Sequence, residues 1–351
     1  MVNIKKKITL TKIATRDRSL FNGYVWHKNK RLCFKTWLNY TLRNDAVVHP
    51  ANCKMSIWLD PHELTTIRSL ASKRIKQDSS FIQRIIEAVH NHWLKLEPFT
   101  SRKKSISTQA EFKYFLNKYI IWWSHASMLM IIPDLPQLPQ TIKRNVLDVR
   151  AQYEMYSDIS DTLLIQYFKK HFPRYASLST VISPREIDAL AKHTLSATTL
   201  NAVKRRINEG WALINGVLVS YNDSPKLLSR FHLTLESYNT RVKNNTLTGT
   251  PAYPGRVRGI ARLVMKKSEL EKVRIGDILV SDATSPDFLP AMKKAAAFIT
   301  DEGGLTCHAA IVAREMKKPC IVGTKIATQV IKNGMPIDVD AKRGIVTIIK
   351  E

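Results

Sequence analysis

The sequence predicts an α+β protein of two domains: a mainly α-helical N-terminal domain with a small β-hairpin, residues 1–245, and a compact α/β domain, residues 246–351. Three observations predict this division. Residues 1–245 hold three of the 12 glycines of the chain, and residues 246–351 hold the other nine. Apolar residues recur at helical spacing in the first part and form short runs between glycines in the second. Residues 239–248 are polar without apolar periodicity, as is typical of a linker.

The N-terminal domain is predicted to be helical from Asp60 onward. Residues 1–60 mix aromatic, branched and polar residues and favour no single secondary structure. Asp60 is a typical N-cap, and Pro61 follows at the first helical position. Further helices are predicted where apolar residues recur at three- and four-residue steps, and one of them opens with a capping-box spacing at Ser183. These helices are residues 81–93, 112–132, 142–172 and 183–206.

Residues 211–221 interrupt the helices. They alternate around Asn215-Gly216, the dipeptide most typical of a two-residue turn, so we predict a small β-hairpin. Residues 222–238 are predicted to return to helix. The most apolar run, residues 119–132, is shorter than the roughly 20 residues that a membrane-spanning helix needs. We therefore interpret it as a buried core helix and expect no contact with a membrane.

Residues 246–351 alternate short apolar runs with helical patterns, as expected of an α/β domain. Strands are predicted at residues 258–265, 278–280, 296–300, 320–322 and 346–349. Helices are predicted at residues 285–294, 309–316 and 327–331.

The chain carries 55 Lys and Arg against 29 Asp and Glu, a formal net charge of +26. Of these residues, 38 basic and 18 acidic ones lie in residues 1–245, so the basic excess belongs mainly to the helical domain. We favour a solvated basic surface, with an acidic protein or nucleic acid as a less favoured partner. Hydrophobic residues make up 44% of the chain, which excludes disorder for most of it.

The cysteines and the N-terminus favour the cytoplasm. The four cysteines form no CxxC pair and no dense framework, so reduced thiols are expected. The N-terminus has basic residues but no apolar run of signal-peptide length behind them.

No metal site is predicted. His90 and His92 point in nearly opposite directions on a helix and are interpreted as solvated. His125 lies inside the apolar run and is interpreted as a core residue.

The candidate site is the segment DEGGLTCHAAIVARE, residues 301–315. An apolar strand precedes it, Gly303 and Gly304 form a turn, and a helix begins near His308. The free N–H groups and the dipole of a helix N-terminus both favour an anion. A histidine placed there can take up a phosphoryl group as a covalent intermediate. We therefore predict His308 as a phosphorylated residue.

Four neighbours of His308 are predicted to shape the phosphate environment. Thr306 and Cys307 are placed to donate weak hydrogen bonds to the phosphate or to orient the ring. Ala309 is small and leaves room for an approaching donor. Arg314 either makes a surface contact or steers a nucleotide phosphate, and the sequence favours neither role.

Several runs occur in an order that resembles the phosphohistidine swivelling domain, or mobile domain, of phosphoenolpyruvate (PEP)-utilising enzymes. They are GTPAYPGRVRGIARLV at 249–264, residues 276–304, GGLTCHAAIVARE at 303–315, PCIVGT at 319–324 and DVDAKRGIV at 338–346. The Thr-Cys-His form is most similar to that of PEP synthases. The resemblance covers about 105 residues at the C-terminal end of the sequence.

The resemblance implies a carrier role. In the family, the histidine matching His308 is phosphorylated, and the domain swings between an ATP-grasp nucleotide site and a second active site. The residue matching Thr306 is a regulatory phosphorylation site in some members. ATP with Mg²⁺ is therefore expected on a partner domain, and no cofactor is expected on this chain. The layout, a helical region followed by a mobile domain, is similar to the C-terminal part of PEP synthase-like proteins and to rifampicin phosphotransferases.

Two functions remain open from the sequence. Residues 1–245 are too few, too helical and too glycine-poor to be an ATP-grasp or a PEP-binding barrel module. The first hypothesis is therefore a phosphotransfer protein, a phosphotransferase component incomplete on its own. It receives a phosphoryl group on His308 from an ATP-grasp kinase subunit in trans and passes it to an unidentified acceptor. The alternative is a non-catalytic adaptor that keeps the swivelling fold and binds nucleic acid or protein through its basic helical face.

Overall fold

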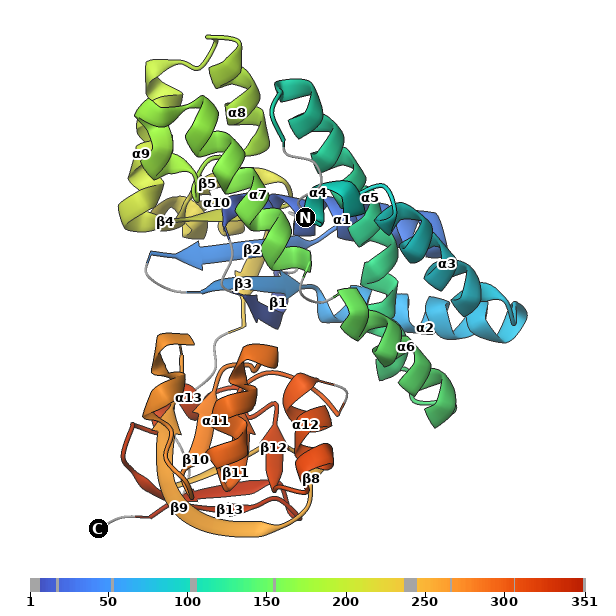
Figure 1. Cartoon of the computed structure of the whole chain (residues 1–351), viewed down its shortest axis with the longest axis vertical. Coiled ribbons are helices and arrows are strands. Elements are labelled where there is room, and N and C mark those ends of the chain that lie inside the picture. The colour runs from blue at the N-terminus through green and yellow to red at the C-terminus, as the bar shows by residue number, and fades with distance from the viewer. Residues whose placement is uncertain are drawn as a thin grey trace, which may run out of the picture. The chain divides into compact units, whose positions relative to one another are not determined.

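The structure is a computed structural model, and it divides the chain into two units, Met1–Glu236 and Ser237–Glu351 (Figure 1). It describes residues 7–16, 19–51, 54–101, 106–153, 156–236, 245–265, 267–305 and 307–349. We call the two parts unit 1 and unit 2. Residues 239–244 of the predicted linker lie outside the described residues, and Thr246–Thr248 form strand β7 of unit 2.

Unit 1 contains a six-stranded sheet in the order β5-β4-β2-β3-β1-β6. The strands are β1 (Ile8–Arg16), β2 (Asp45–Pro50), β3 (Met55–Leu59), β4 (Gly210–Ile214), β5 (Val217–Ser220) and β6 (Leu233–Leu235). The predicted hairpin is confirmed as β4 and β5, with positive φ angles at Asn215 and Gly216 as its tight turn requires. The hairpin is not isolated, because β4 pairs with β2 from the region that the sequence left open.

The helices of unit 1 follow the local sequence signals. They are α1 (Leu20–Leu38), α2 (Pro61–Gln77), α3 (Phe81–Trp93), α4 (Glu97–Thr100), α5 (Gln109–Ile131), α6 (Gln140–Tyr153), α7 (Tyr156–His171), α8 (Pro184–Ala191), α9 (Ala197–Glu209) and α10 (Ser224–Arg230), with the 3₁₀ turns η1 (Ile132–Asp134), η2 (Pro173–Leu178) and η3 (Tyr221–Asp223). Asp60 caps α2, since its Oδ1 accepts the N–H of His62 at 2.9 Å. Ser183 and Glu186 form the predicted capping box of α8.

Three predicted helices are shorter than expected. The prediction for residues 142–172 corresponds to two helices, α6 and α7, and that for residues 183–206 to α8 and α9. His193, between α8 and α9, has a φ of 56°, a conformation that ends a helix. The prediction of helix for residues 222–238 is wrong for residues 231–236, because the chain enters β6 and pairs with β1, and residues 237 and 238 lie outside the described residues.

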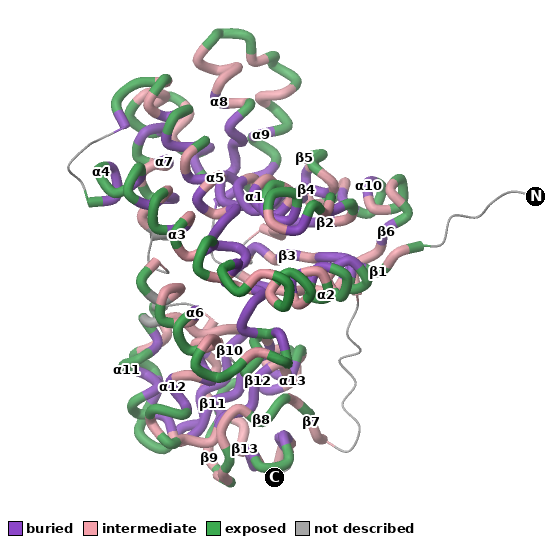
Figure 2. The backbone as a smooth tube through the Cα atoms, turned by 90° about the vertical axis from the view of Figure 1, so that its right-hand side faces the viewer, coloured by how far each residue is buried: buried purple, intermediate pink, exposed green. Residues whose placement is uncertain are grey.

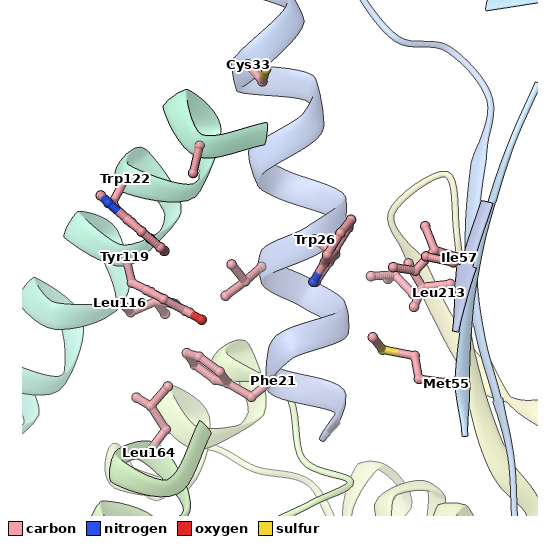
Figure 3. Packing of buried hydrophobic residues seen from close by; sticks show 14 of the residues in the cluster. Phe21, Trp26, Cys33, Met55, Ile57, Leu116, Tyr119, Trp122, Leu164 and Leu213 are labelled. Atoms are coloured by element: carbon pink, nitrogen blue, oxygen red, sulfur yellow. The ribbon is translucent and has the colours of Figure 1, made fainter. Parts of the chain in front are cut away.

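Helix α1 lies at the centre of unit 1, between the sheet and α5 (Figure 3). Met55 and Leu213 of the sheet lie on one side of α1, and Tyr119 and Trp122 of α5 lie on the other (Figure 3). Tyr119 and Trp122 are almost completely buried. The interpretation of residues 119–132 as a core helix is confirmed. Within the described ranges, none of the helices combines the length and the apolar character that crossing a membrane requires.

Unit 2 is built on an eight-stranded sheet in the order β7-β14-β13-β9-β10-β11-β12-β8. Besides β7, its strands are β8 (Thr250–Tyr253), β9 (Arg256–Leu263), β10 (Ile278–Ser281), β11 (Ala297–Thr300), β12 (Cys320–Val322), β13 (Pro336–Asp340) and β14 (Ile345–Ile348). Strands β9 to β12 run parallel, and β10, β11 and β12 are buried along their length (Figure 2). The α11 (Leu289–Lys294) and α12 (His308–Met316) helices pack on one face of the sheet, and α13 (Ala327–Val330) packs on the other.

The five predicted strands of unit 2 are confirmed to within two residues at each end, while β7, β8 and β13 were not predicted. The β13 sequence, PIDVD, carries two carboxylates and gives no apolar run. In the sheet, one of them, Asp338, binds Arg256 and Arg258 of the neighbouring β9 at 2.9 and 2.8 Å. These arginines hold the pKa of Asp338 down at about 2, Arg256 through the largest effect. Ion pairs with the neighbouring strand thus stabilise β13 although its sequence is partly polar.

Candidate functional site

The site lies where the parallel strands of unit 2 end. The carboxyl ends of β10, β11 and β12 share one edge of the sheet, the edge at which α/β folds bind ligands. Backbone hydrogen bonds hold the loops after these strands together: the N–H of Asp301 donates to Ser281 at 3.1 Å, and that of Thr324 donates to Thr300 at 3.1 Å. The loop after β11 leads directly into α12.

His308 is the first residue of α12, which agrees with the predicted start of this helix. Cys307 is the N-cap, with extended φ and ψ angles of −74° and 163°, and its side chain makes no capping hydrogen bond. The carbonyl of Cys307 accepts the N–H of Ile311 at 3.0 Å, as an N-cap carbonyl does. Because the cap side chain does not use the first-turn N–H groups, the end of α12 keeps the electrostatic character of an anion site. The His308 side chain is half-buried in this position.

The two glycines before His308 differ in what they require. Gly303 has a φ of 105°, and a Cβ on it would lie 2.7 Å from Sγ of Cys307. Gly304 has no other atom within 4 Å of the position that its Cβ would occupy. Gly303 is therefore needed for the turn, and Gly304 leaves the surface in front of α12 open.

Gly303→Ala is expected to loosen the start of α12 by about 1–3 kcal/mol, because the new methyl group meets Cys307 and the left-handed backbone is strained. Hydrogen exchange of the first hydrogen-bonded amides of α12, beginning with Ile311, measures this as faster local opening. Gly304→Ala is the matched control and is expected to leave exchange unchanged. Equal exchange in both variants would mean that the turn does not hold the helix end.

Asp301, which begins the candidate segment but was given no role by the sequence analysis, joins two loops of the edge. It is buried, and burial raises the pKa of its carboxyl group, while hydrogen bonds from Thr328 and Thr324 oppose that shift. Its Oδ1 accepts the hydroxyl of Thr324 at 2.9 Å, and its Oδ2 accepts the N–H of Thr328 at 3.2 Å. The side chain thus fixes the loop after β12 against the loop that carries His308. An acidic residue directly after an apolar strand was the available sequence signal.

Thr284, in the loop after β10, is a second residue that the sequence analysis missed. Its Oγ1 is shielded from solvent and has no hydrogen-bond partner among the residues that the structure describes. Buried hydroxyl groups are normally paired, so this one is a candidate for a bond to a group that arrives at the same edge.

The other predicted site residues are distributed along α12 and its loop. Ala309 is buried and packs into the core of unit 2, and Cys307 is half-buried beside the same core. Arg314 is exposed in the last turn of α12, at the opposite end from His308, where a cation complements the helix dipole. Thr306 lies outside the described residues. In the described ranges, no three His, Cys, Asp or Glu side chains are grouped as a metal site would require.

A sequence model described as "PEP-utilising enzyme, mobile domain" matches residues 273–344, which contain His308 and the loop before it. This part of unit 2 is therefore similar to the mobile domain of PEP-utilising enzymes. More particularly, this part of the chain is similar to PEP synthases. A "Probable phosphoenolpyruvate synthase" of Archaeoglobus fulgidus is 54% identical over 100 residues, 28% of this chain and 13% of that protein. A "Phosphoenolpyruvate synthase" of Pyrococcus furiosus is also 54% identical over 100 residues, 28% of this chain and 12% of that protein.

One similarity extends beyond unit 2. A "Probable phosphoenolpyruvate synthase" of Methanothermobacter thermautotrophicus is 37% identical over 186 residues, 51% of this chain and 25% of that protein. The aligned part is about half of this chain and is longer than unit 2. The alignment therefore includes part of unit 1. The chain spans a quarter or less of the length of these curated relatives.

Proposed function

We propose that this chain is a phosphotransfer protein that carries a phosphoryl group on His308. The observation that supports this most is the place of His308, at a helix N-terminus whose N-cap side chain makes no capping hydrogen bond, within the part of the chain that matches the mobile-domain model. A ring nitrogen of His308 attacks the phosphorus, the N–P bond forms, and the O–P bond to the leaving nucleotide breaks. The α12 N–H groups stabilise the phosphoryl oxygens during the transfer.

The donor in this proposal is ATP with Mg²⁺, bound by an ATP-grasp kinase subunit in trans, in the cytoplasm. We propose that unit 1 helps to bind the acceptor of the phosphoryl group. The similarity that reaches from unit 2 into unit 1 supports a shared role for the two units. The free thiols of Cys33, Cys307 and Cys320 support a reducing compartment.

A basic adaptor is the second candidate, because the positive excess of the chain lies mainly in residues 1–245. In this alternative, unit 2 keeps the swivelling fold without carrying phosphate. Binding to nucleic acid or to an acidic protein then weakens steeply as salt is raised.

The test is to incubate the full chain with γ-labelled ATP, Mg²⁺ and an ATP-grasp protein from the same genome. The expected result is one phosphoryl group per chain, lost in acid and stable in alkali, as phosphohistidine is. No label with any such partner, together with salt-sensitive nucleic-acid binding, would favour the adaptor and overturn the proposal.

A further inference from the structure

We propose that a groove on unit 1 binds a small phosphorylated molecule that also carries hydroxyl groups, such as a sugar phosphate. The groove lies between α2 and the segment that follows η1. Its volume is about 570 Å³, and it is open to solvent, so a ligand there would be held by polar contacts and not by enclosure. This site is separate from His308 and does not depend on the phosphotransfer proposal.

The lining residues come from one face of α2 and one turn. Five of them belong to α2. The second to fifth follow the first by three, four, seven and eight residues, which places all five on a single face of the helix. The lining residues are Ser69, Ser72, Lys73, Lys76 and Gln77 from α2, and Pro136 and Gln137 from the segment before α6.

The groove is cationic. No carboxylate lines it, and neither Lys73 nor Lys76 has an ion-pair or hydrogen-bond partner among the described residues. The carboxylates closest to it in the chain are engaged elsewhere: Asp134 pairs with Arg68 at 3.4 Å, and Asp78 pairs with Arg84. The two ammonium groups are therefore available to an anion from solvent.

Charge complementarity with the helix end explains only part of this arrangement. Cations in the last turn of a helix interact well with its carbonyl groups, and Arg74 and Lys76 are placed to do so. The interaction with the helix end does not account for Lys73, which lies one turn before Lys76. It also does not account for a groove lined by hydroxyl and amide groups. Arg74 lies at the same helix end but does not line the groove. A substitution of Arg74 therefore distinguishes the interaction with the helix end from binding in the groove.

The lining chemistry selects the ligand class. Two lysines offer compact charges of the kind that binds phosphate. The hydroxyls of Ser69 and Ser72 and the amides of Gln77 and Gln137 both donate and accept, which suits ligand hydroxyl groups. Pro136 is the single residue of the lining whose side chain carries no polar group, so a polar side chain is available along most of the groove.

Titration calorimetry of the full chain with glucose 6-phosphate, inorganic phosphate and glucose tests the proposal. Glucose 6-phosphate is expected to bind more tightly than either of the other two probes. Lys73→Ala with Lys76→Ala is expected to weaken its binding at least about tenfold, and Gln137→Ala is expected to weaken glucose 6-phosphate more than phosphate. Arg74→Ala is the matched control and is expected to bind like the wild type.

Three results would overturn the proposal. The first is no binding of glucose 6-phosphate to the wild type. The second is an equal loss in Arg74→Ala, which would show that net charge and not the groove is responsible. The third is equal affinity for inorganic phosphate, which would remove the hydroxyl part of the ligand. None of them bears on His308, because the experiment involves no phosphoryl transfer.

Discussion

Replacing His308 with glutamine is expected to abolish covalent phosphorylation of the chain, leaving incorporation at background. Glutamine keeps a polar side chain of similar length but has no nucleophilic nitrogen, so the N–P bond cannot form. Because α12, its N-cap and Gly303 remain, the anion site itself is retained. The effect is therefore on the chemistry and not on the fold. It is measured as label retained on the chain after incubation with the ATP-grasp partner.

The sequence makes this experiment easy to interpret. His308 is the single histidine of residues 246–351, so a phosphohistidine peptide from this region identifies the residue without ambiguity. His62→Gln, an exposed residue at the start of α2, is the matched control and is expected to label fully. Hydrogen exchange of α12 shows whether His308→Gln keeps the helix. Label that persists in His308→Gln would assign the carrier elsewhere.

The candidate site could be predicted because its chemistry lies in one continuous segment. A strand, two glycines, a histidine and a helix follow one another over residues 296–316, and each has a local signal. The roles of Asp301 and Thr284 were not predicted, because they depend on contacts across loops. Asp301 is defined by Thr324 and Thr328, more than 20 residues later, and a single sequence does not indicate that these loops meet.

The same distinction holds for the fold. The Asp60 cap, the Ser183 capping box and the Asn215-Gly216 turn depend on neighbours within a few residues, and all three were predicted. The sheet of unit 1 was not, because β2 pairs with β4 across more than 150 residues of chain. Pairing of this kind is specified by burial and by partners on other strands, which leave no pattern in either segment alone.

Arg206→Met is expected to lower the free energy of unfolding of unit 1 by about 3–5 kcal/mol, because it leaves a largely buried carboxylate without its partner. Arg206 of α9 makes a bidentate pair with Glu186 of α8, at 2.8 and 2.9 Å, and the side chains are 5% and 12% exposed. Its guanidinium also donates to the carbonyl of Val181 at 3.2 Å. Glu186 in turn completes the capping box with Ser183. The Arg206 side chain therefore connects α8 and α9, two helices that are separated by a break in the helix at His193.

Urea unfolding followed by tryptophan fluorescence measures this effect in the intact chain, because all seven tryptophans lie in residues 1–236. Arg205→Met is the matched control: Arg205 pairs with Glu209 on the surface, and little change in the free energy of unfolding is expected. Adding Glu186→Gln to Arg206→Met removes the unpaired charge and is expected to recover part of the loss. A midpoint for Arg206→Met equal to that of Arg205→Met would show that the buried pair does not stabilise the α8–α9 arrangement.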